Sequence, residues 1–382
     1  MRVDVKPDLL LWACERVGRS VDELAQKQAL HKLPAWLGGE ERPTFKQLEK
    51  FAQATHTPFG YFFLPEPPEE SVPIPDLRTV GNQHIGRPSP DLLDTIYAMQ
   101  RRQAWLREMQ IECEAEPLDF VGSARLSDDP SATGREMRRI VNFGDGWAAK
   151  VGTWEGAVGK LRRAIEKLGV MAVINGIVGN NTHRKLNVEE FRGFALCDIY
   201  APLIFVNGAD AKSAKMFTLV HELAHIWLGQ EGVSGFPGIF PGDQEIESFC
   251  DKAAAEFLVP AQELKASWSD VKNAAQPFKR LAGQFKVSPI VAGRRAMDLR
   301  LVDREMFFAF YREYIKKEHI PGRTGGGDFY HNQNTRVGEM FALQVIRAAK
   351  EGRVSFKEAY DLTGLRGGAF QKYANRLGFN FP

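Results

Sequence analysis

The chain has 382 residues, 44% of them hydrophobic and 26% charged, and its formal net charge is +2. This length predicts two or three domains, and the apolar content is ample for a globular core. No apolar run reaches the length of a membrane span, and the N-terminus has no apolar signal segment. We therefore expect a cytoplasmic protein that has no membrane partner.

The four cysteines are scattered along the chain and form no C-x-x-C pair. We expect buried free thiols, and neither disulfides nor zinc ligands. The cysteines are Cys14, Cys113, Cys197 and Cys250.

The net charge hides an uneven distribution. Residues 263–382 hold 21 Lys+Arg against 12 Asp+Glu, a net charge of +9, so residues 1–262 carry −7. A basic segment indicates an acidic partner or nucleic acid. A solvated helical surface explains the same charge equally well.

The first 66 residues predict a module of short helices. Ser20 and Glu23 have the spacing of a capping box, and Thr44 is the expected N-cap of a later helix. A turn is expected at Gly38-Gly39.

Trp36 is followed by Gly39 three residues later and by Pro43 seven residues later. This is the spacing at the end of the recognition helix in Xre-type helix-turn-helix modules, which residues 1–66 resemble. The resemblance implies DNA binding. The residues expected to contact bases are Lys27, His31 and Lys32.

Two features count against DNA binding by this module. Pro34 would disrupt a recognition helix unless it lies in the first turn. Residues 1–66 also hold nine Lys+Arg and nine Asp+Glu, whereas affinity for DNA depends mostly on neutralising phosphates. DNA binding and a protein-binding or scaffolding role are therefore equally open.

Residues 67–90 are rich in proline and predict an extended linker. Apolar positions three and four apart then predict a long helix over 90–114. The helices expected next are 132–143 and 155–168, and the expected strands are 170–174, 193–197 and 203–206. We expect the strands to form a small antiparallel sheet, whose edge offers backbone hydrogen bonds to an extended substrate.

The motif His221-Glu222-Leu223-Ala224-His225 lies in a predicted helix over 215–228. Residues four apart share one face of a helix, so His221 and His225 are placed to bind one metal ion. Glu222 is the expected general base for a water on that metal. The surrounding residues are apolar, and buried ionisable groups are costly without a partner, so a metal site is favoured over a chance match.

A third ligand is expected from a second helix over 245–260. Glu247 and Asp251 are four residues apart, so Glu247 as a ligand and Asp251 as the partner of a ligand histidine fit the usual organisation of zinc sites. Glu245 is a competing ligand, and the Glu-x-x-x-Asp spacing favours Glu247. The helical phase of Cys250 points it away from Glu247 and predicts packing.

The run FTLVHELAHIWLG followed by EIESFCDKAAAEFLVP resembles the ImmA/IrrE-type metallopeptidases. The preceding run FRGFALCDIYAPLIFVNGADAKSAKMFTLVHE is similar to their lead-in from sheet to helix. The resemblance covers residues 169–260 and extends to the longer members that have an Xre-like N-terminal module. It implies zinc-dependent cleavage of a protein, often a DNA-binding repressor. The residues implied are His221, His225 and Glu247 as ligands and Glu222 as the base. Manganese or iron at the same ligands stays open.

Two loops are candidates for contact with a substrate. Residues 229–242 are rich in glycine and proline and lie between the two ligand helices, so we expect them to touch the substrate or gate the cleft. Residues 180–185 form a polar loop in which His183 and Arg184 are candidates for stabilising an oxyanion. Simple solvation of this loop is the alternative.

The C-terminal third predicts two helix pairs. One spans 277–301 with a turn at Ser288-Pro289, and the other follows a helix within 337–377 and turns at Gly364. Residues 328–331 are expected to be a mobile connector. Both pairs are basic, but neither has a motif specific for DNA contact.

Together these patterns predict a mostly helical α+β protein with a zincin-like core, in which a small antiparallel sheet lies beside the H-E-x-x-H helix. The expected domains are an N-terminal module (1–66), a linker (67–90), a metallopeptidase domain (91–262) and a basic helical region (263–382). The predicted function is zinc-dependent cleavage of a specific intracellular protein, either a transcriptional repressor or another regulator. The alternative is a regulator or antitoxin that binds DNA or a cognate toxin and uses the zincin fold as a scaffold.

Overall fold

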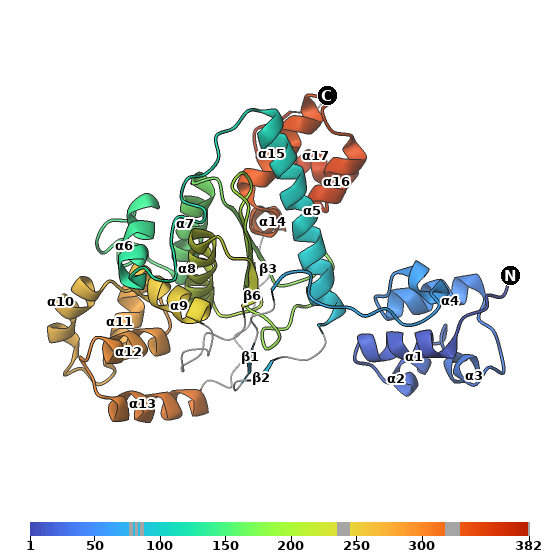
Figure 1. The fold of residues 1–382 in the computed structure, drawn as a ribbon, viewed down its shortest axis with the longest axis horizontal. Helices are drawn as coiled ribbons and strands as arrows, with labels where there is room; N and C mark the ends of the chain where they lie inside the picture. The colour runs from blue at the N-terminus through green and yellow to red at the C-terminus, as the bar shows by residue number, and fades with distance from the viewer. Residues whose placement is uncertain (76–78, 81–82, 85–87, 235–244, 318–328, 381–382) are drawn as a thin grey trace. The chain divides into compact units, whose positions relative to one another are not determined.

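The computed structural model describes residues 1–75, 79–80, 83–84, 88–234, 245–317 and 329–380. Its contacts divide the chain into two units, Met1–Pro73 with Gly86–Ile96 and Ile74–Ile85 with Tyr97–Pro382. Both units are drawn in Figure 1.

The first unit consists of short helices around one apolar core. Its elements are α1 (Pro7–Arg16), α2 (Val21–Ala25), α3 (Leu33–Leu37), α4 (Phe45–Ala54), the 3-10 helix η1 (Phe59–Phe63) and the start of α5 (Pro90–Glu112). Ser20 and Glu23 form the predicted capping box at α2, and Thr44 forms one with Gln47 at α4. Each box satisfies N–H groups that the first turn of a helix leaves without partners.

The predicted recognition helix is largely replaced by turns. Pro34 lies in the first turn of the five-residue helix α3, which is the one place where a helix tolerates proline. Lys27, His31 and Lys32 precede this helix in turns and bends, so the prediction of a helical base-reading face there is wrong. Lys32 Nζ instead binds both carboxylate oxygens of Glu41 at 2.8 and 2.9 Å.

The segment predicted to be an extended linker contains a short hairpin, because β1 (Thr79–Val80) pairs antiparallel with β2 (Gln83–His84). Near the start of the segment, Glu70 accepts hydrogen bonds of 2.6 and 2.8 Å from the buried Arg16. A bidentate pair of this kind fixes both distance and orientation. It therefore anchors this end of the segment to α1.

The second unit places helices around a small sheet, so the mostly helical α+β fold class is confirmed. Its helices are the rest of α5, then α6 (Pro130–Ile140), α7 (Trp154–Lys167), α8 (Lys212–Leu228), α9 (Glu245–Leu258), α10 (Ala261–Val271), α11 (Pro277–Phe285), α12 (Pro289–Asp298), α13 (Arg304–Lys317), α14 (Phe329–Val337), α15 (Glu339–Lys350), α16 (Phe356–Thr363) and α17 (Gly367–Arg376). Its longer strands are β3 (Met171–Asn175), β4 (Gly193–Leu196), β5 (Leu203–Asn207) and β6 (Gly232–Ser234). Within the described residues, no helix combines the length and the hydropathy that a membrane crossing needs.

The four-stranded sheet has the order β3-β5-β4-β6. β4 is antiparallel to β5 and to β6, but β3 and β5 are parallel. The prediction of a purely antiparallel sheet is therefore wrong for one pair. Every residue of β3, β4 and β5 is buried, so the sequence has no polar alternation from which a strand pairing could be inferred.

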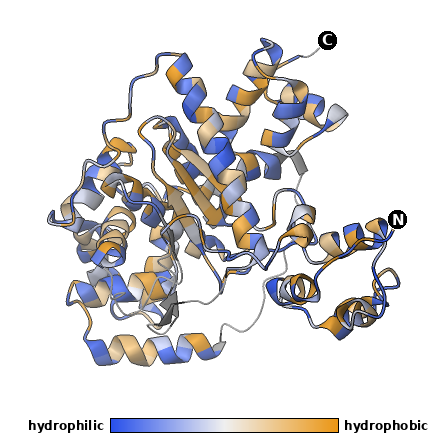
Figure 2. Ribbon diagram, turned by 45° about the vertical axis from the view of Figure 1, so that its right-hand side comes forward, coloured by the Kyte–Doolittle hydropathy of each residue, from blue (hydrophilic) through white to orange (hydrophobic). Residues whose placement is uncertain are grey.

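The helix α8 covers one face of this sheet. Ala172, Ile204 and Ala195 are partners across β3, β5 and β4, so they lie on one face, and they share a buried cluster with α8. Phe194 and Phe205 belong to the other face, where their rings stack at 4.9 Å. Figure 2 shows the apolar strands enclosed by helices. The sheet is thus buried on both faces.

The main core continues past the domain boundary that we expected after residue 262. One buried cluster contains Phe257 of α9, Leu264 of α10, Leu281 of α11 and Ala292 of α12. Helices α10 to α12 therefore pack with the helices of the expected metallopeptidase domain.

Both predicted C-terminal helix pairs are confirmed, as α11–α12 and α16–α17. Gly364 ends α16 with a φ of 69°, the left-handed conformation that favours glycine. Part of the expected mobile connector, Phe329–His331, forms the first turn of α14. Asp328 lies outside the described residues.

The burial predicted for the cysteines holds for two of them. Cys14 and Cys250 are buried free thiols, whereas Cys197 is half-buried and Cys113 is exposed. Cys113 follows the last residue of α5 and lies in an exposed turn.

A buried carboxylate joins α7 to the C-terminal helices. Glu166 accepts the N–H of Glu339, the first residue of α15, at 2.9 Å, and it pairs with Arg162 at 2.6 Å. The N-cap of α15 is Gly338, which has no side chain to cap the helix, so Glu166 fills that role from α7. Burial raises the pKa of Glu166 to about 7 in spite of Arg162.

The variant Glu166→Gln tests whether burial or the ion pair with Arg162 dominates the pKa of the Glu166 carboxyl group. The folded-state pKa of about 7 exceeds the ordinary value of 4.5, so the folded chain binds the proton more tightly between these values. The resulting stabilisation is complete below pH 4.5 and is lost as the pH rises through 7. Glutamine keeps an acceptor for the Glu339 N–H but does not titrate. Between about pH 5 and about pH 8 we expect the wild-type protein to lose up to about 3 kcal/mol of unfolding free energy relative to the variant. Urea midpoints of both proteins measure this change, and a constant difference would show that Arg162 keeps Glu166 ionised.

Candidate metal centre

The H-E-x-x-H motif lies in the second half of α8, which begins at Lys212 and ends at Leu228. Gly229 ends the helix with a φ of 67°, and its N–H turns back to the carbonyl oxygen of His225. All residues of Met216–Leu228 are buried. The ionisable groups of the motif are therefore enclosed and need partners inside the protein.

Three donor groups from two helices converge here. His221 and His225 are 4% and 0% exposed, and their Nε2 atoms lie 3.2 Å apart. Glu247 of α9 places Oε2 at 3.3 Å from His221 Nε2 and Oε1 at 3.1 Å from His225 Nε2. These donor atoms all lie within 4.8 Å of one another, a spacing that suits a metal ion. The structure thus brings together the three residues that the sequence proposes as ligands.

The spacing of these atoms fits a tetrahedral ion. Ligand atoms at about 2.05 Å from a zinc ion lie roughly 3.3 Å from one another in a tetrahedron. The two histidine Nε2 atoms are 3.2 Å apart, and each of them lies 3.1 or 3.3 Å from a different oxygen of Glu247. Two imidazole nitrogens at this distance cannot both present bare lone pairs to each other, so a proton or a cation must lie between them. Two histidines and one carboxylate also leave one zinc position open, as is typical of catalytic sites.

Asp251 orients one of the histidines. Its Oδ1 lies 3.0 Å from His221 Nδ1, so the ring donates this N–H to Asp251 and its Nε2 faces Glu247. Burial lowers the pKa of His221, but Glu247 and Asp251 outweigh burial and hold this pKa well above its ordinary value. Burial raises the pKa of Glu247, yet the two histidines hold it well below its usual range. The arrangement therefore favours positive charge between these groups.

Of the two glutamates near the start of α9, Glu247 is the one placed at the histidines. Glu245 is the exposed first residue of the helix, whereas the Glu247 side chain is 17% exposed. Asp251 lies four residues after Glu247 and therefore shares its face of the helix.

The nearby cysteines are unsuited to bind the metal. Burial, followed by the charges of Glu231 and Glu222, raises the pKa of Cys197 to about 12. Burial and the charge of Glu247 place the pKa of Cys250 well above its ordinary value. Burial therefore disfavours the thiolate form of both, and among the described residues the donor cluster contains no cysteine. Cys250 instead packs in the main buried cluster, as its helical phase predicts.

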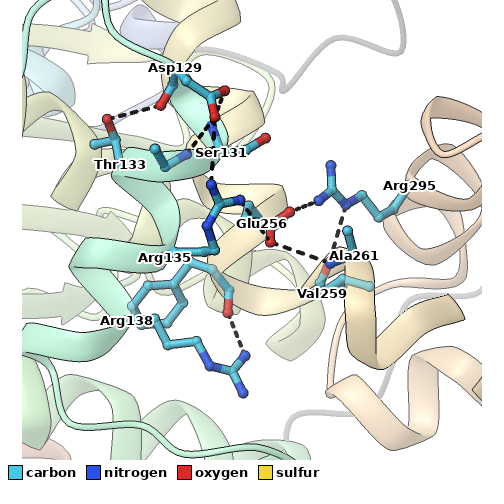
Figure 3. Close-up of polar contacts among 11 residues, drawn as sticks. Asp129, Ser131, Thr133, Arg135, Arg138, Glu256, Val259, Ala261 and Arg295 are labelled. Atoms are coloured by element: carbon cyan, nitrogen blue, oxygen red, sulfur yellow. Dashed lines mark hydrogen bonds and ion pairs between the residues drawn. The ribbon is translucent and has the colours of Figure 1, made fainter. Parts of the chain in front are cut away.

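Arginines from neighbouring helices fix the far end of α9 (Figure 3). The buried Glu256 pairs with Arg295 of α12, and its Oε1 lies 3.7 Å from a guanidinium nitrogen of Arg135 in α6. Arg138 of α6 donates to the carbonyl oxygen of Phe257 at 2.8 Å. The helix that carries the third donor is therefore held rigidly at the end away from the histidines. Sequence reasoning missed this network, because its members are far apart along the chain.

The predicted oxyanion candidates belong to a loop with other contacts. His183 is exposed, and its N–H donates to Asn181 Oδ1 at 3.0 Å, while Arg184 is half-buried in the same turn. Asn180 of this loop donates to the carbonyl oxygen of Gly364 at 2.9 Å. This contact ties the loop to the C-terminal helices. A role for His183 or Arg184 in substrate contact stays a prediction.

The loop between the two donor helices is described in part. Gly232–Ser234 form the edge strand β6, which the sequence did not predict because three residues are too few for a recognisable pattern. Residues 235–242 lie outside the described residues, so contact of this loop with a substrate also stays a prediction.

Two family models match segments of the chain. A domain of unknown function, DUF8813, matches residues 337–376, which contain α15, α16 and α17. No curated protein matches the chain. The second model, a peptidase family described as the IrrE N-terminal-like domain, matches residues 165–297, about a third of the chain. This match includes all three converging donors and extends past residue 262 into α12. Residues 165–297 are therefore similar to the ImmA/IrrE family of peptidases, the family that their sequence motifs resemble.

Proposed function

We propose that this protein is a zinc-dependent metallopeptidase that cleaves a specific regulatory protein, such as a transcriptional repressor. The observation that carries the proposal is the convergence of His221, His225 and Glu247, whose donor atoms all lie within 4.8 Å of one another. The match to a peptidase family model supports the reaction class. Zinc is the metal that two imidazoles and one carboxylate at these distances fit best, although manganese and iron use similar donors.

His221, His225 and Glu247 would hold the ion, and their buried surroundings would keep competing water away from it. Zinc bound there would polarise a peptide carbonyl and lower the pKa of a water molecule to about 7. Asp251 keeps the Nε2 atom of His221 directed at the centre through its bond to Nδ1.

Glu222 is the proposed general base. Its side chain is fully buried next to His221 in α8, so few solvent molecules compete for the proton that it carries. The carboxylate takes a proton from water as the water oxygen bonds to the carbonyl carbon. It then delivers this proton to the amine nitrogen as the C–N bond breaks, so that protons and electrons balance.

The variant His225→Ala tests the metal assignment. It removes one of three protein ligands, and the site should then retain little zinc, because two ligands bind far more weakly than three. Elemental analysis of purified protein measures zinc per chain. The matched control is His183→Ala, which removes an exposed histidine and should leave zinc at the wild-type level. Full zinc in His225→Ala would rule out the proposed ligand set.

The variant Glu222→Gln tests the base. Glutamine has the same size but does not accept a proton at neutral pH, so cleavage should slow by about 100- to 10,000-fold with zinc content unchanged. Fragments are detected by mass spectrometry after the zinc-loaded protein is incubated with the products of neighbouring genes. The control is Glu245→Gln at the exposed first residue of α9, which should cleave at the wild-type rate.

If Glu222→Gln cleaved as fast as the wild-type protein, the mechanism would be wrong. If this variant kept full function in cells while His225→Ala lost it, the protein would act as a metal-stabilised scaffold for a toxin or for DNA.

A further inference from the structure

Gly193 is the first residue of β4. It lies on the sheet face that α8 covers, because its partner Val206 belongs to the same buried cluster as that helix. A Cβ atom built on Gly193 would lie 2.7 Å from Glu222 Oε1 and 2.7 Å from Thr218 Cγ2. It would also lie 2.8 Å from the carbonyl oxygen of Phe205. Real Cβ atoms do not come within 3.0 Å of such neighbours. Any other residue at this position therefore requires something around it to move.

The three neighbours differ in how easily they move. The carbonyl oxygen of Phe205 is part of β5, which pairs with β4 along its length, so it cannot retreat without breaking the ladder. Thr218 is 4% exposed, and its hydroxyl donates to the carbonyl oxygen of Ala214 at 3.2 Å, which fixes the position of Cγ2. The Glu222 carboxylate is the neighbour at the end of a flexible side chain. It is therefore the group that a Cβ atom at Gly193 would displace most readily.

We propose that Gly193 is a positioning residue for Glu222, because its missing side chain leaves the space in which the carboxylate rests against β4. The inference rests on the proposed role of Glu222 as the general base. The histidine nitrogens face Glu247 on α9, whereas Glu222 Oε1 lies against the sheet. A Cβ atom at residue 193 therefore moves the base and leaves the metal donors in place.

A purely structural role for Gly193 makes a different prediction. Gly193 and Ala195 are both small and both face α8, so they allow this helix to pack closely on the sheet. If close packing were the only reason for the glycine, Gly193→Ala would cost the same stability whether or not the Glu222 carboxylate is present.

The first experiment is a double-mutant cycle on the stability of the full-length protein. The urea midpoint is measured for the wild-type protein, Gly193→Ala, Glu222→Ala and the double variant. We expect Gly193→Ala to lower the midpoint less in the Glu222→Ala background, because one of the close contacts is then gone. Equal losses in both backgrounds would overturn the proposal. The matched control is Gly283→Ala in α11, where a Cβ atom meets nothing within 4 Å, and no loss is expected there. If Gly193→Ala alone does not fold, the same cycle is measured with Thr218→Ser in all four proteins, which removes the contact with Cγ2.

The second experiment tests whether the Glu222 carboxylate is in position, by measuring ligand binding to the Co²⁺-loaded protein through its visible spectrum. The probe is acetohydroxamate, a small chelator whose hydroxyl proton a neighbouring carboxylate accepts. Gly193→Ala should bind one cobalt per chain and bind the probe about tenfold more weakly. Adding Gly193→Ala to Glu222→Gln should not weaken probe binding any further, because the base is already absent. Wild-type affinity in Gly193→Ala, or additive losses in the double variant, would overturn the proposal. A wild-type protein that binds no cobalt would contradict the proposed function, and the stability cycle would still decide whether Gly193 makes room for Glu222.

Discussion

The attraction between the Glu247 carboxylate and a positive charge held by two histidines is the interaction on which the structure of this region depends. An ionised carboxylate removed from water loses several kcal/mol of solvation unless a charge of opposite sign is close. Here the two histidine Nε2 atoms lie 3.2 Å apart, and each lies 3.1 or 3.3 Å from one oxygen of Glu247. A divalent cation bound between these atoms would satisfy all of them at once. Such a cation would also link α8 to α9, which follow one another along the chain through a glycine-rich loop.

The geometry of α8 places the proposed metal ligands and the proposed base on different faces of the helix. Successive residues of an α-helix are turned by about 100° from one another, whereas residues four apart are turned by about 40°. His221 and His225 therefore face α9 together, and Glu222 between them faces the sheet. On the α9 side, Asp251 and the pair between Glu256 and Arg295 set the position of the third donor. On the sheet side, the close approach at Gly193 sets the position of the carboxylate.

Local rules in the sequence predicted the parts of the protein that local contacts determine. The capping boxes at Ser20 and Thr44, the turn at Gly364 and the four-residue spacing within α8 and within α9 all follow from neighbours along the chain. The parallel pairing of β3 with β5 did not follow, because short strands buried on both faces carry no pattern that states their direction.

The sequence also did not predict contacts between segments that are far apart along the chain. Arg295 and Glu256 are 39 residues apart and meet only after α9 and α12 have packed. Gly193 carried a partial signal, since glycine within a strand often marks the close approach of another group. Nothing in the sequence stated that the approaching group would be Glu222. The helical base-reading face expected around His31 failed because Pro34 moved the start of the helix past it.

X-ray absorption of the zinc-loaded protein at the zinc K-edge tests the ligand set most directly. Coordination by His221, His225 and Glu247 predicts only nitrogen and oxygen neighbours, at about 2.0 to 2.1 Å, with the outer-shell scattering of two imidazole rings. A sulfur neighbour at about 2.3 Å would place Cys197 or Cys250 on the metal and would contradict the proposed centre.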